Sequence, residues 1–375
     1  MLLKLIQILI SLILLLTSCI TQFIPQPNES QEFLVVEGLI TDQSGPYTIK
    51  LSSTLPLGTR SRAKHVTRCN VSITDDLGNR FKFGETDTGT YVSDPAKFTG
   101  KTGRFYTLHV NTNNAYNNHN YESYPVEMIT VPLIDSLYYE KVKISESFWW
   151  SYQPEGCQVY LNTYDPTSQC RYFRWEFIET WEFRLPYSVP NNTCWITSYS
   201  DKINIKSTAS LAEARILKYP LNFISNLTDR LKVKYSILVR QYSITEDEYN
   251  YWEKLQNVSE QVGGLYDMIP AAVGSNVYCI DNPDEKILGY FSVSASTSRR
   301  FFIKDYFIGI FNPYTADACE ADTIWGDTYI PNLNASIWVI IDNLPLYKVI
   351  TYTRGCADCT TRGTNQEPSF WKDYK

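Results

Sequence analysis

The stretch CRYFRWEFIETWEF spans residues 170–183. Its aromatic side chains occupy every second position with charged side chains between them: Phe173, Trp175 and Phe177 against Arg174 and Glu176. A period of two with one apolar face predicts a half-buried β-strand. The chain also holds 28 Tyr, 17 Phe and 9 Trp, and this enrichment favours strands elsewhere. We therefore expect a mainly β protein.

Short strands separated by turn signals precede this stretch. FLVVEGLIT from Phe33 and YTIKLSS from Tyr47 alternate in the same way. In CNVSITDDLGNRFKF, the residues Asp76–Asn79 turn the chain between two apolar runs, as in a β-hairpin. Further strands follow from Tyr91 onward. Short, regularly spaced strands of this kind predict a small immunoglobulin-like β-sandwich over residues 33–130.

A larger β-rich, sandwich-like domain with one docked helix is expected over residues 131–310. Strand-like alternation gives way to a helical period just after Ile244. The helix signals are a capping box, a hydrophobic staple and a terminal glycine pair: Thr245 with Glu248, Ile244 with Tyr249, and Gly263-Gly264. They predict a helix near residues 246–262. Residues 311–375 form a cysteine-containing tail with little periodicity, which disulfides are expected to hold.

The N-terminus carries an apolar run that ends in LILLLTSCI, residues 12–20. It is shorter than the about 20 apolar residues of a membrane span and has the layout of a secretory signal. Its last residues, Leu16-Thr17-Ser18-Cys19, resemble the bacterial lipobox, in which the cysteine receives a diacylglycerol and the chain is cut before it. We expect residues 1–18 to be a signal peptide and residues 19–32 a lipidated tether that starts at Cys19. The alternative is an ordinary signal peptide cut elsewhere, with Cys19 free.

Eight further cysteines fit an exported chain. An even number in a secreted protein predicts up to four disulfides, and the candidates are Cys69, Cys157, Cys170, Cys194, Cys279, Cys319, Cys356 and Cys359. The pair Cys356-Ala-Asp-Cys359 has three interpretations: structural disulfides, a redox centre or a metal site. No amphipathic helix follows it, as a redox motif requires, and no second pair or nearby histidine completes a zinc site. We expect structural disulfides and no metal.

Composition and motifs argue against nucleic-acid binding and against an enzyme. The formal net charge is −6, and no basic stretch is long enough to attract nucleic acid. The three histidines are His65, His109 and His119, and no nucleophile elbow, phosphate loop or dinucleotide motif is present. Carboxylates such as Asp75-Asp76 and Asp281–Glu285 occur at turn spacing without the 12-residue calcium pattern. We expect no cofactor. The aromatic residues allow a sugar-stacking platform, although core packing explains most of them.

Several stretches together resemble a Bacteroidota family of outer-membrane lipoproteins of unknown function, whose genes typically lie beside SusC-type TonB-dependent receptors. They include FLVVEGLITDQSGPYTIKLS, KYSILVRQYSITEDEYNYWEKLQ, NVYCIDNPDEKILGYFSVSAS and CADCTTRGTNQEPSFW. The resemblance runs from about Phe33 to Trp371. It implies an immunoglobulin-like N-terminal domain, a larger β-rich C-terminal domain and a place on the outer membrane as a receptor accessory, with no catalytic residues to assign. Two short segments around Ser136 and Thr323 also resemble the Bacteroidota O-glycosylation sequon.

These observations favour a non-enzymatic binding or scaffold protein, held on the outer membrane by its N-terminal lipid at a face that the sequence leaves open. Its expected partner is a membrane β-barrel, namely a SusC-type receptor in nutrient uptake. The first alternative is an accessory subunit of a machine that assembles or exports outer-membrane proteins. The second is a glycan-binding or glycan-active surface protein.

The anchor makes a direct prediction. Radiolabelled palmitate should enter the wild-type chain and should not enter the Cys19→Ala variant, because that variant lacks the acceptor sulfur. A labelled variant, or an unlabelled wild type, would refute lipidation at Cys19.

Overall fold

The computed structural model describes most of the chain after the expected tether. The described residues are 32–54, 64–113, 117–143, 155–226, 228–260, 273–304, 319, 321–325, 339–343, 347–351 and 354–372. The expected signal peptide, Cys19 and the glycine pair after the helix lie outside them. None of the described helices is long and apolar enough to cross a membrane.

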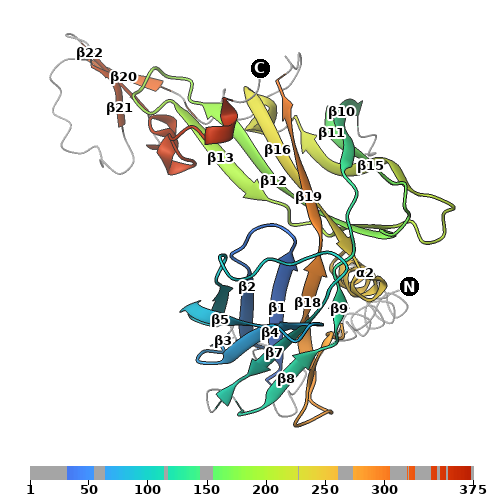
Figure 1. The fold of residues 1–375 in the computed structure, drawn as a ribbon. Helices are drawn as coiled ribbons and strands as arrows, with labels where there is room; N and C mark the ends of the chain where they lie inside the picture. The colour runs from blue at the N-terminus through green and yellow to red at the C-terminus, as the bar shows by residue number, and fades with distance from the viewer. Residues whose placement is uncertain are drawn as a thin grey trace, which may run out of the picture.

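The first unit is one rolled sheet, which we call the first sandwich (Figure 1). Its strands are β1 (Leu34–Thr41), β2 (Thr48–Ser53), β3 (Lys64–His65), β4 (Asn70–Asp75), β5 (Arg80–Asp87), β6 (Thr90–Ser93), β7 (Phe105–Asn111), β8 (Asn120–Ser123), β9 (Val126–Glu127), β17 (Val277–Cys279) and β18 (Ile287–Ser294). The strand order is β17-β8-β7-β4-β5-β6-β2-β1-β18, with β3 on β2 and β9 on β7. The two end strands, β17 and β18, contact each other, so the sheet closes around one core.

Alternation explains this core, as the sequence predicts. In β2 the apolar Ile49 and Leu51 are fully buried while Lys50 between them is exposed. The predicted hairpin is confirmed between β4 and β5. Asp75 holds its turn by accepting hydrogen bonds from the backbone N–H groups of Leu77 and Asn79, at 3.1 and 2.9 Å.

The second unit, the second sandwich, packs two sheets over another core (Figure 1). One sheet has the order β10-β11-β15, and the other has the order β13-β12-β16-β19 with β14 on β12. Their bounds are β10 (Ile134–Lys143), β11 (Glu155–Asp165), β12 (Tyr172–Arg184), β13 (Thr193–Tyr199), β14 (Asn204–Ser207), β15 (Ala214–Ser225), β16 (Lys234–Ile244) and β19 (Ser296–Ile303), with a short 3-10 helix η2 at Asp229–Leu231. The predicted aromatic face of β12 is confirmed, since Phe173, Trp175 and Phe177 are at most 5% exposed.

The two sandwiches share one segment of chain. β18 pairs in parallel with β1 of the first sandwich, and β19, which begins after the single residue Ala295, pairs with β16 of the second. The predicted boundary of the first domain, 33–130, is therefore too narrow, because β17 and β18 complete its sheet. β1 and β18 are about 250 residues apart in the chain. Because pairing over such a separation leaves no local pattern, the sequence does not indicate that β18 belongs to the first domain.

The predicted helix is α2 (Glu246–Glu260). Half of the expected capping box is present, because the Thr245 hydroxyl accepts the Glu248 backbone N–H at 3.2 Å. The Glu248 side chain does not reach back to the cap. Its Oε1 instead accepts hydrogen bonds from Trp252 on α2 and Ser292 on β18. The expected staple residue Tyr249 packs near Tyr172, with ring centroids 5.3 Å apart.

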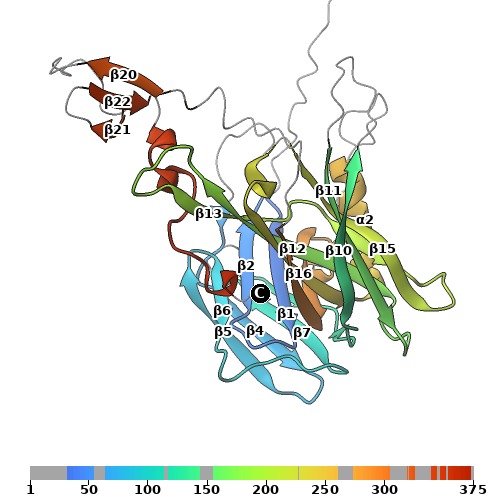
Figure 2. The ribbon, with the colours of Figure 1, turned by 90° about the horizontal axis from the view of Figure 1, so that it is seen from above.

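The tail is held by two disulfides and one buried tryptophan. Its elements are β20 (Ala321–Trp325), β21 (Val339–Asn343), β22 (Tyr347–Thr351), η3 (Arg354–Cys356), η4 (Cys359–Thr361) and η5 (Ser369–Trp371). Cys319 bonds to Cys356, and Cys194 of β13 bonds to Cys359. The three-stranded sheet lies away from both sandwiches, whereas the 3-10 segments return toward β13 (Figure 2). Trp371, 4% exposed, donates its indole N–H to Glu182 of β12.

Four of the eight disulfide candidates are free thiols: Cys69, Cys157, Cys170 and Cys279. All four are buried, two in the core of each sandwich. A buried cysteine packs as a small apolar side chain, so its presence in an exported chain does not require a partner. The two disulfides among the described residues lie within the expected limit of four, and these four candidates are corrected to free thiols.

The close approach of β18 to β1 at Gly289 allows us to predict how a substitution there changes the free energy of unfolding. Gly289 has a φ of +83°, and a Cβ there would lie 2.1 Å from the Val36 carbonyl oxygen. Gly289→Ala should lower the free energy of unfolding by about 2–3 kcal/mol through strain and lost pairing. Gly84→Ala, where nothing lies within 4 Å, should change it by less than about 1 kcal/mol. Urea unfolding followed by tryptophan fluorescence measures both, and equal effects would contradict the tight fit at Gly289.

Candidate functional site

The residues predicted from sequence do not converge on one site. Cys19 lies outside the described residues. Ser136 is half-buried in β10 and accepts a hydrogen bond from Asn162 at 2.8 Å, while Thr323 is exposed on β20. The O-glycosylation of both stays a prediction.

The structure brings other residues together in a groove between the two sandwiches, the inter-sandwich groove. Three hollows of about 280, 540 and 730 Å³ share lining residues there. The two larger hollows lie between the sandwiches, with walls from β1, β2 and β18 on one side and from β12, β16, β19 and α2 on the other. The smallest adjoins them on the second sandwich, where β12, β13, β14, β16 and α2 line it. Grooves at the meeting point of two domains are frequent ligand sites.

A buried charged pair lies beside this groove, which one of its members, Arg174, lines. Arg174 of β12 is 7% exposed, and Glu248 of α2 is fully buried. Arg174 Nε lies 4.0 Å from Glu248 Oε1, and a guanidinium nitrogen of Arg174 also hydrogen-bonds to Glu176. The guanidinium stacks between two aromatic rings, with its central carbon 4.8 Å from the centroids of Tyr242 and Trp252.

Burial and opposite charge compete at this pair. Burial raises the pKa of Glu248, and the Arg174 charge and two hydrogen bonds only partly oppose the rise. Burial works to lower the pKa of Arg174, but Glu176 and Glu248 outweigh it and raise the value. Burial and Glu176 raise the pKa of Tyr242 to about 12. Arg174 is therefore charged, and Tyr242 keeps its proton near neutral pH.

The groove has unused hydrogen-bonding capacity. Within the described part of the chain, Arg174 Nε and Glu248 Oε2 are buried with no hydrogen-bond partner. Unsatisfied buried groups of this kind are costly and point to a water molecule or ligand atom beside them. Among the described residues that line the groove, none is a histidine or a cysteine. Its chemistry is suited to binding a polar or charged group.

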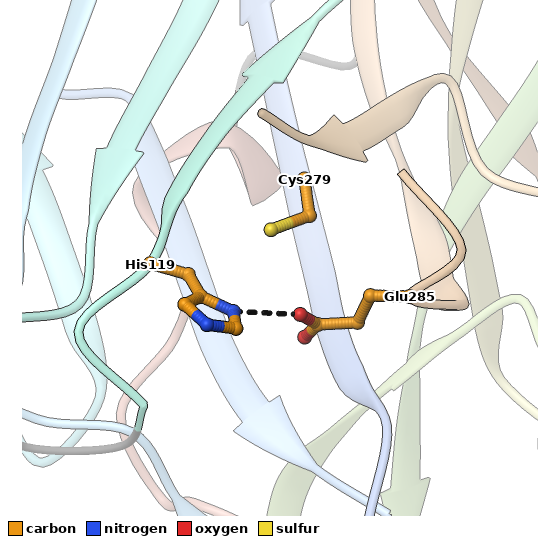
Figure 3. Close-up of side chains that lie close together, drawn as sticks. All are labelled: His119, Cys279 and Glu285. Carbon is orange, nitrogen blue, oxygen red and sulfur yellow. Dashed lines mark hydrogen bonds and ion pairs between the residues drawn. The ribbon is translucent and has the colours of Figure 1, made fainter. Parts of the chain in front are cut away.

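A second cluster lies in the first sandwich, where His119, Cys279 and Glu285 meet (Figure 3). The sequence predicts no metal here, because His119 and Cys279 are 160 residues apart and their spacing carries no ligand pattern. The pairing of β8 with β17 brings them together. The local signal in the sequence is the turn-rich segment Asp281–Glu285, whose carboxylates lie at turn spacing without the calcium-binding pattern.

The fold is that of a mainly β protein of two sandwiches with a polar groove between them. A family described as "Domain of unknown function (DUF4249)" matches residues 20–300, so the chain belongs to this family. The match includes the first sandwich, α2, the inter-sandwich groove and the His119 cluster. No curated protein matches the chain. The resemblance noted in the sequence is thereby confirmed as membership of a family of unknown function.

The buried pair predicts an asymmetric effect of mutation. Arg174→Met leaves a buried carboxylate without its counter-charge and should cost about 3–5 kcal/mol at neutral pH. Glu248→Gln should cost less, because Arg174 keeps Glu176 as its partner. The pKa of Glu248 is higher in the folded protein than in the unfolded chain. The free energy of unfolding is therefore larger at low pH, where Glu248 is protonated in both states, and it falls as pH rises through the folded-state pKa. The cost of Arg174→Met should therefore shrink on acidification.

Urea unfolding at about pH 7.5 and about pH 5 tests this sign. The double variant Arg174→Met/Glu248→Gln is the control, and its stability should depend less on pH than that of Arg174→Met. A cost of Arg174→Met that stays constant or grows toward acid pH would contradict a buried charged carboxylate.

Proposed function

We propose that the protein is a lipid-anchored, non-enzymatic binding accessory of an outer-membrane β-barrel, namely a SusC-type TonB-dependent receptor in nutrient uptake. Two features support this proposal: the lipobox at Cys19 for the membrane anchor, and the inter-sandwich groove for the binding role. One observation carries the binding role: Arg174 lines a groove formed by both sandwiches, and its buried Nε and the neighbouring buried Oε2 of Glu248 lack hydrogen-bond partners. A lipid at the first mature residue would keep this groove near the membrane, at the end of a short tether.

Two sheet edges of the second sandwich, β13 and β15, favour binding through the groove over strand addition at those edges. The edge strand β13 is covered by the tail, because Trp195 and Thr364 exchange backbone hydrogen bonds at 2.9 and 3.0 Å. The edge strand β15 carries Pro220 and two register irregularities against β11. Prolines and bulges on edge strands discourage pairing with another chain.

The charges of the groove favour a partner segment with its own polar or ionic groups. Lys50 and Glu37 line the wall from the first sandwich, and Arg240 lines it from β16. Tyr251 and Trp252 add aromatic surface from α2. Buried aromatic and arginine side chains commonly dominate the binding energy of protein interfaces, and here both kinds lie in one hollow.

The test is photo-crosslinking of the lipidated full-length chain in native membranes. A benzoylphenylalanine replaces Tyr199, which is 73% exposed and lines the groove, or Leu77, which is equally exposed on the β4–β5 turn outside it. Tyr199→benzoylphenylalanine should capture a β-barrel protein that mass spectrometry identifies, and Leu77→benzoylphenylalanine should not.

The identity of the captured protein separates the alternatives. A TonB-dependent receptor supports the proposal, whereas an assembly or export barrel supports the first alternative role. Failure to recover any barrel protein, both by crosslinking and by mild-detergent purification, would overturn the proposal. Binding on a glycan array that is weakened by Arg240→Glu would instead support the glycan-binding alternative.

A further inference from the structure

We propose that His119, Cys279 and Glu285 form a zinc site with three protein ligands and one exchangeable position. This inference does not rest on the proposed function, since none of the three residues lines the inter-sandwich groove. It concerns the edge of the first sandwich where β17 joins β8.

The fold itself brings the ligands together. Cys279 is the last residue of β17 and pairs with Tyr121 of β8. His119 directly precedes β8, and Glu285 lies on the short loop that connects β17 to β18. Asp281 fastens this loop by accepting hydrogen bonds from the backbone and side chain of Asn120. The ligands therefore come from ordered, mutually bonded segments.

The distances are close to those of a tetrahedral site. The ligand atoms of the three residues all lie within 4.8 Å of one another, and His119 Nδ1 is 2.8 Å from Glu285 Oε2 (Figure 3). Zinc bonds of about 2.0–2.3 Å place neighbouring ligand atoms about 3.3–3.6 Å apart. Small side-chain rotations would bring the thiol to this separation.

A second set of contacts orients the carboxylate. The Tyr121 hydroxyl donates to Glu285 Oε1 at 2.6 Å, and Asn117 Nδ2 lies 3.2 Å from the same oxygen. Asn117 also donates to the Tyr121 hydroxyl. Partners that hold a ligand from behind are a regular feature of metal sites. Glu285 Oε2 is left facing His119 and the thiol.

The thiol is placed where a cation would convert it to a ligand. The backbone N–H groups of Asn282 and Asp281 point hydrogen bonds at the sulfur of Cys279. A bound divalent metal deprotonates a coordinating thiol, and these two N–H groups would then stabilise the thiolate. Glu285 provides a further negative charge within the cluster.

The mixture of ligands selects the metal. A thiolate, an imidazole and a carboxylate together suit Zn²⁺, whereas Ca²⁺ and Mg²⁺ require oxygen ligands. The cluster holds one cysteine, so it cannot form a disulfide within itself. The His119 and Glu285 side chains are 30% and 15% exposed. This leaves a route by which water or a partner's side chain can supply the fourth ligand.

The competing explanation is that His119 and Glu285 form only an ion pair that fastens the loop. His109 and Glu122 provide a matched comparison in the same sheet, because they face each other across β7 and β8 with 3.6 Å between Nδ1 and Oε2. His109 belongs to no three-ligand cluster among the described residues. Cys69 provides a second comparison, as a buried free thiol in the same core.

The experiment uses the full-length protein as purified in detergent, treated with EDTA and kept without reductant so that both disulfides stay closed. Titration calorimetry with Zn²⁺ should give one site per chain. Co²⁺ added to the same wild-type protein should give a thiolate-to-cobalt charge-transfer band in the near ultraviolet. His109→Gln and Cys69→Ser should retain both signals.

Cys279→Ser and His119→Gln should each weaken zinc binding about 100-fold or more, and Cys279→Ser should abolish the cobalt band. Near-ultraviolet circular dichroism confirms that each variant is folded. The cobalt spectrum of the wild-type protein tests the site even where a variant fails to fold. Absence of that band, or zinc affinity equal in wild type, Cys279→Ser and His119→Gln, would overturn the site and leave the ion pair as the explanation.

Discussion

The two sandwiches are fixed relative to each other because one extended segment, β18 followed by β19, is hydrogen-bonded into both. Its junction is held from each side. Asp42 of the first sandwich accepts the Ser296 backbone N–H at 2.8 Å, and the Ser243 backbone N–H of β16 bonds to the Ala295 carbonyl at 3.2 Å. A single residue between two strands allows little hinge motion. The groove between the sandwiches therefore has a defined shape rather than the variable one of a flexible linker.

Helix α2 strengthens this arrangement by contacting both units at once. Tyr251 packs on Tyr290 of β18, with ring centroids 4.8 Å apart, and Glu248 accepts a hydrogen bond from Ser292. On the other side, Trp252 stacks on Arg174 of β12. The buried charged pair is thus a consequence of the docking of the helix. α2 covers the face of β12 that carries Arg174. Because the helix removes Arg174 from water, its charge is paired with Glu176 and Glu248.

Sequence patterns predicted the local elements and missed the contacts between distant ones. Alternation identified β12 and its aromatic face, and the Thr245 cap located α2, because both signals lie within a few residues. The same alternation placed Arg174 on the polar face of β12, which is normally exposed. It is buried because a helix that begins about 70 residues later packs over it, and no period in the sequence encodes this.

The free cysteines illustrate the same limit. The number of cysteines and the predicted export of the chain predict a disulfide framework, but among the described cysteines only those that fasten the irregular tail are bonded. Cys157 and Cys170 lie in an apolar core that holds the second sandwich without them. Cys279 also lies in a core, yet it is beside a histidine and a carboxylate. Count and spacing do not distinguish these environments, whereas strand pairing does.

The His119 cluster and the inter-sandwich groove are connected through β18. Glu285 is two residues before Ile287, where β18 begins, and the same strand lines the groove with Gly289, Tyr290 and Ser292. A ligand that tightened the loop before β18 would restrict the start of the strand that both sandwiches share. The cluster and one wall of the groove therefore belong to one continuous backbone segment, which its pairing with β1 holds along the whole of β18.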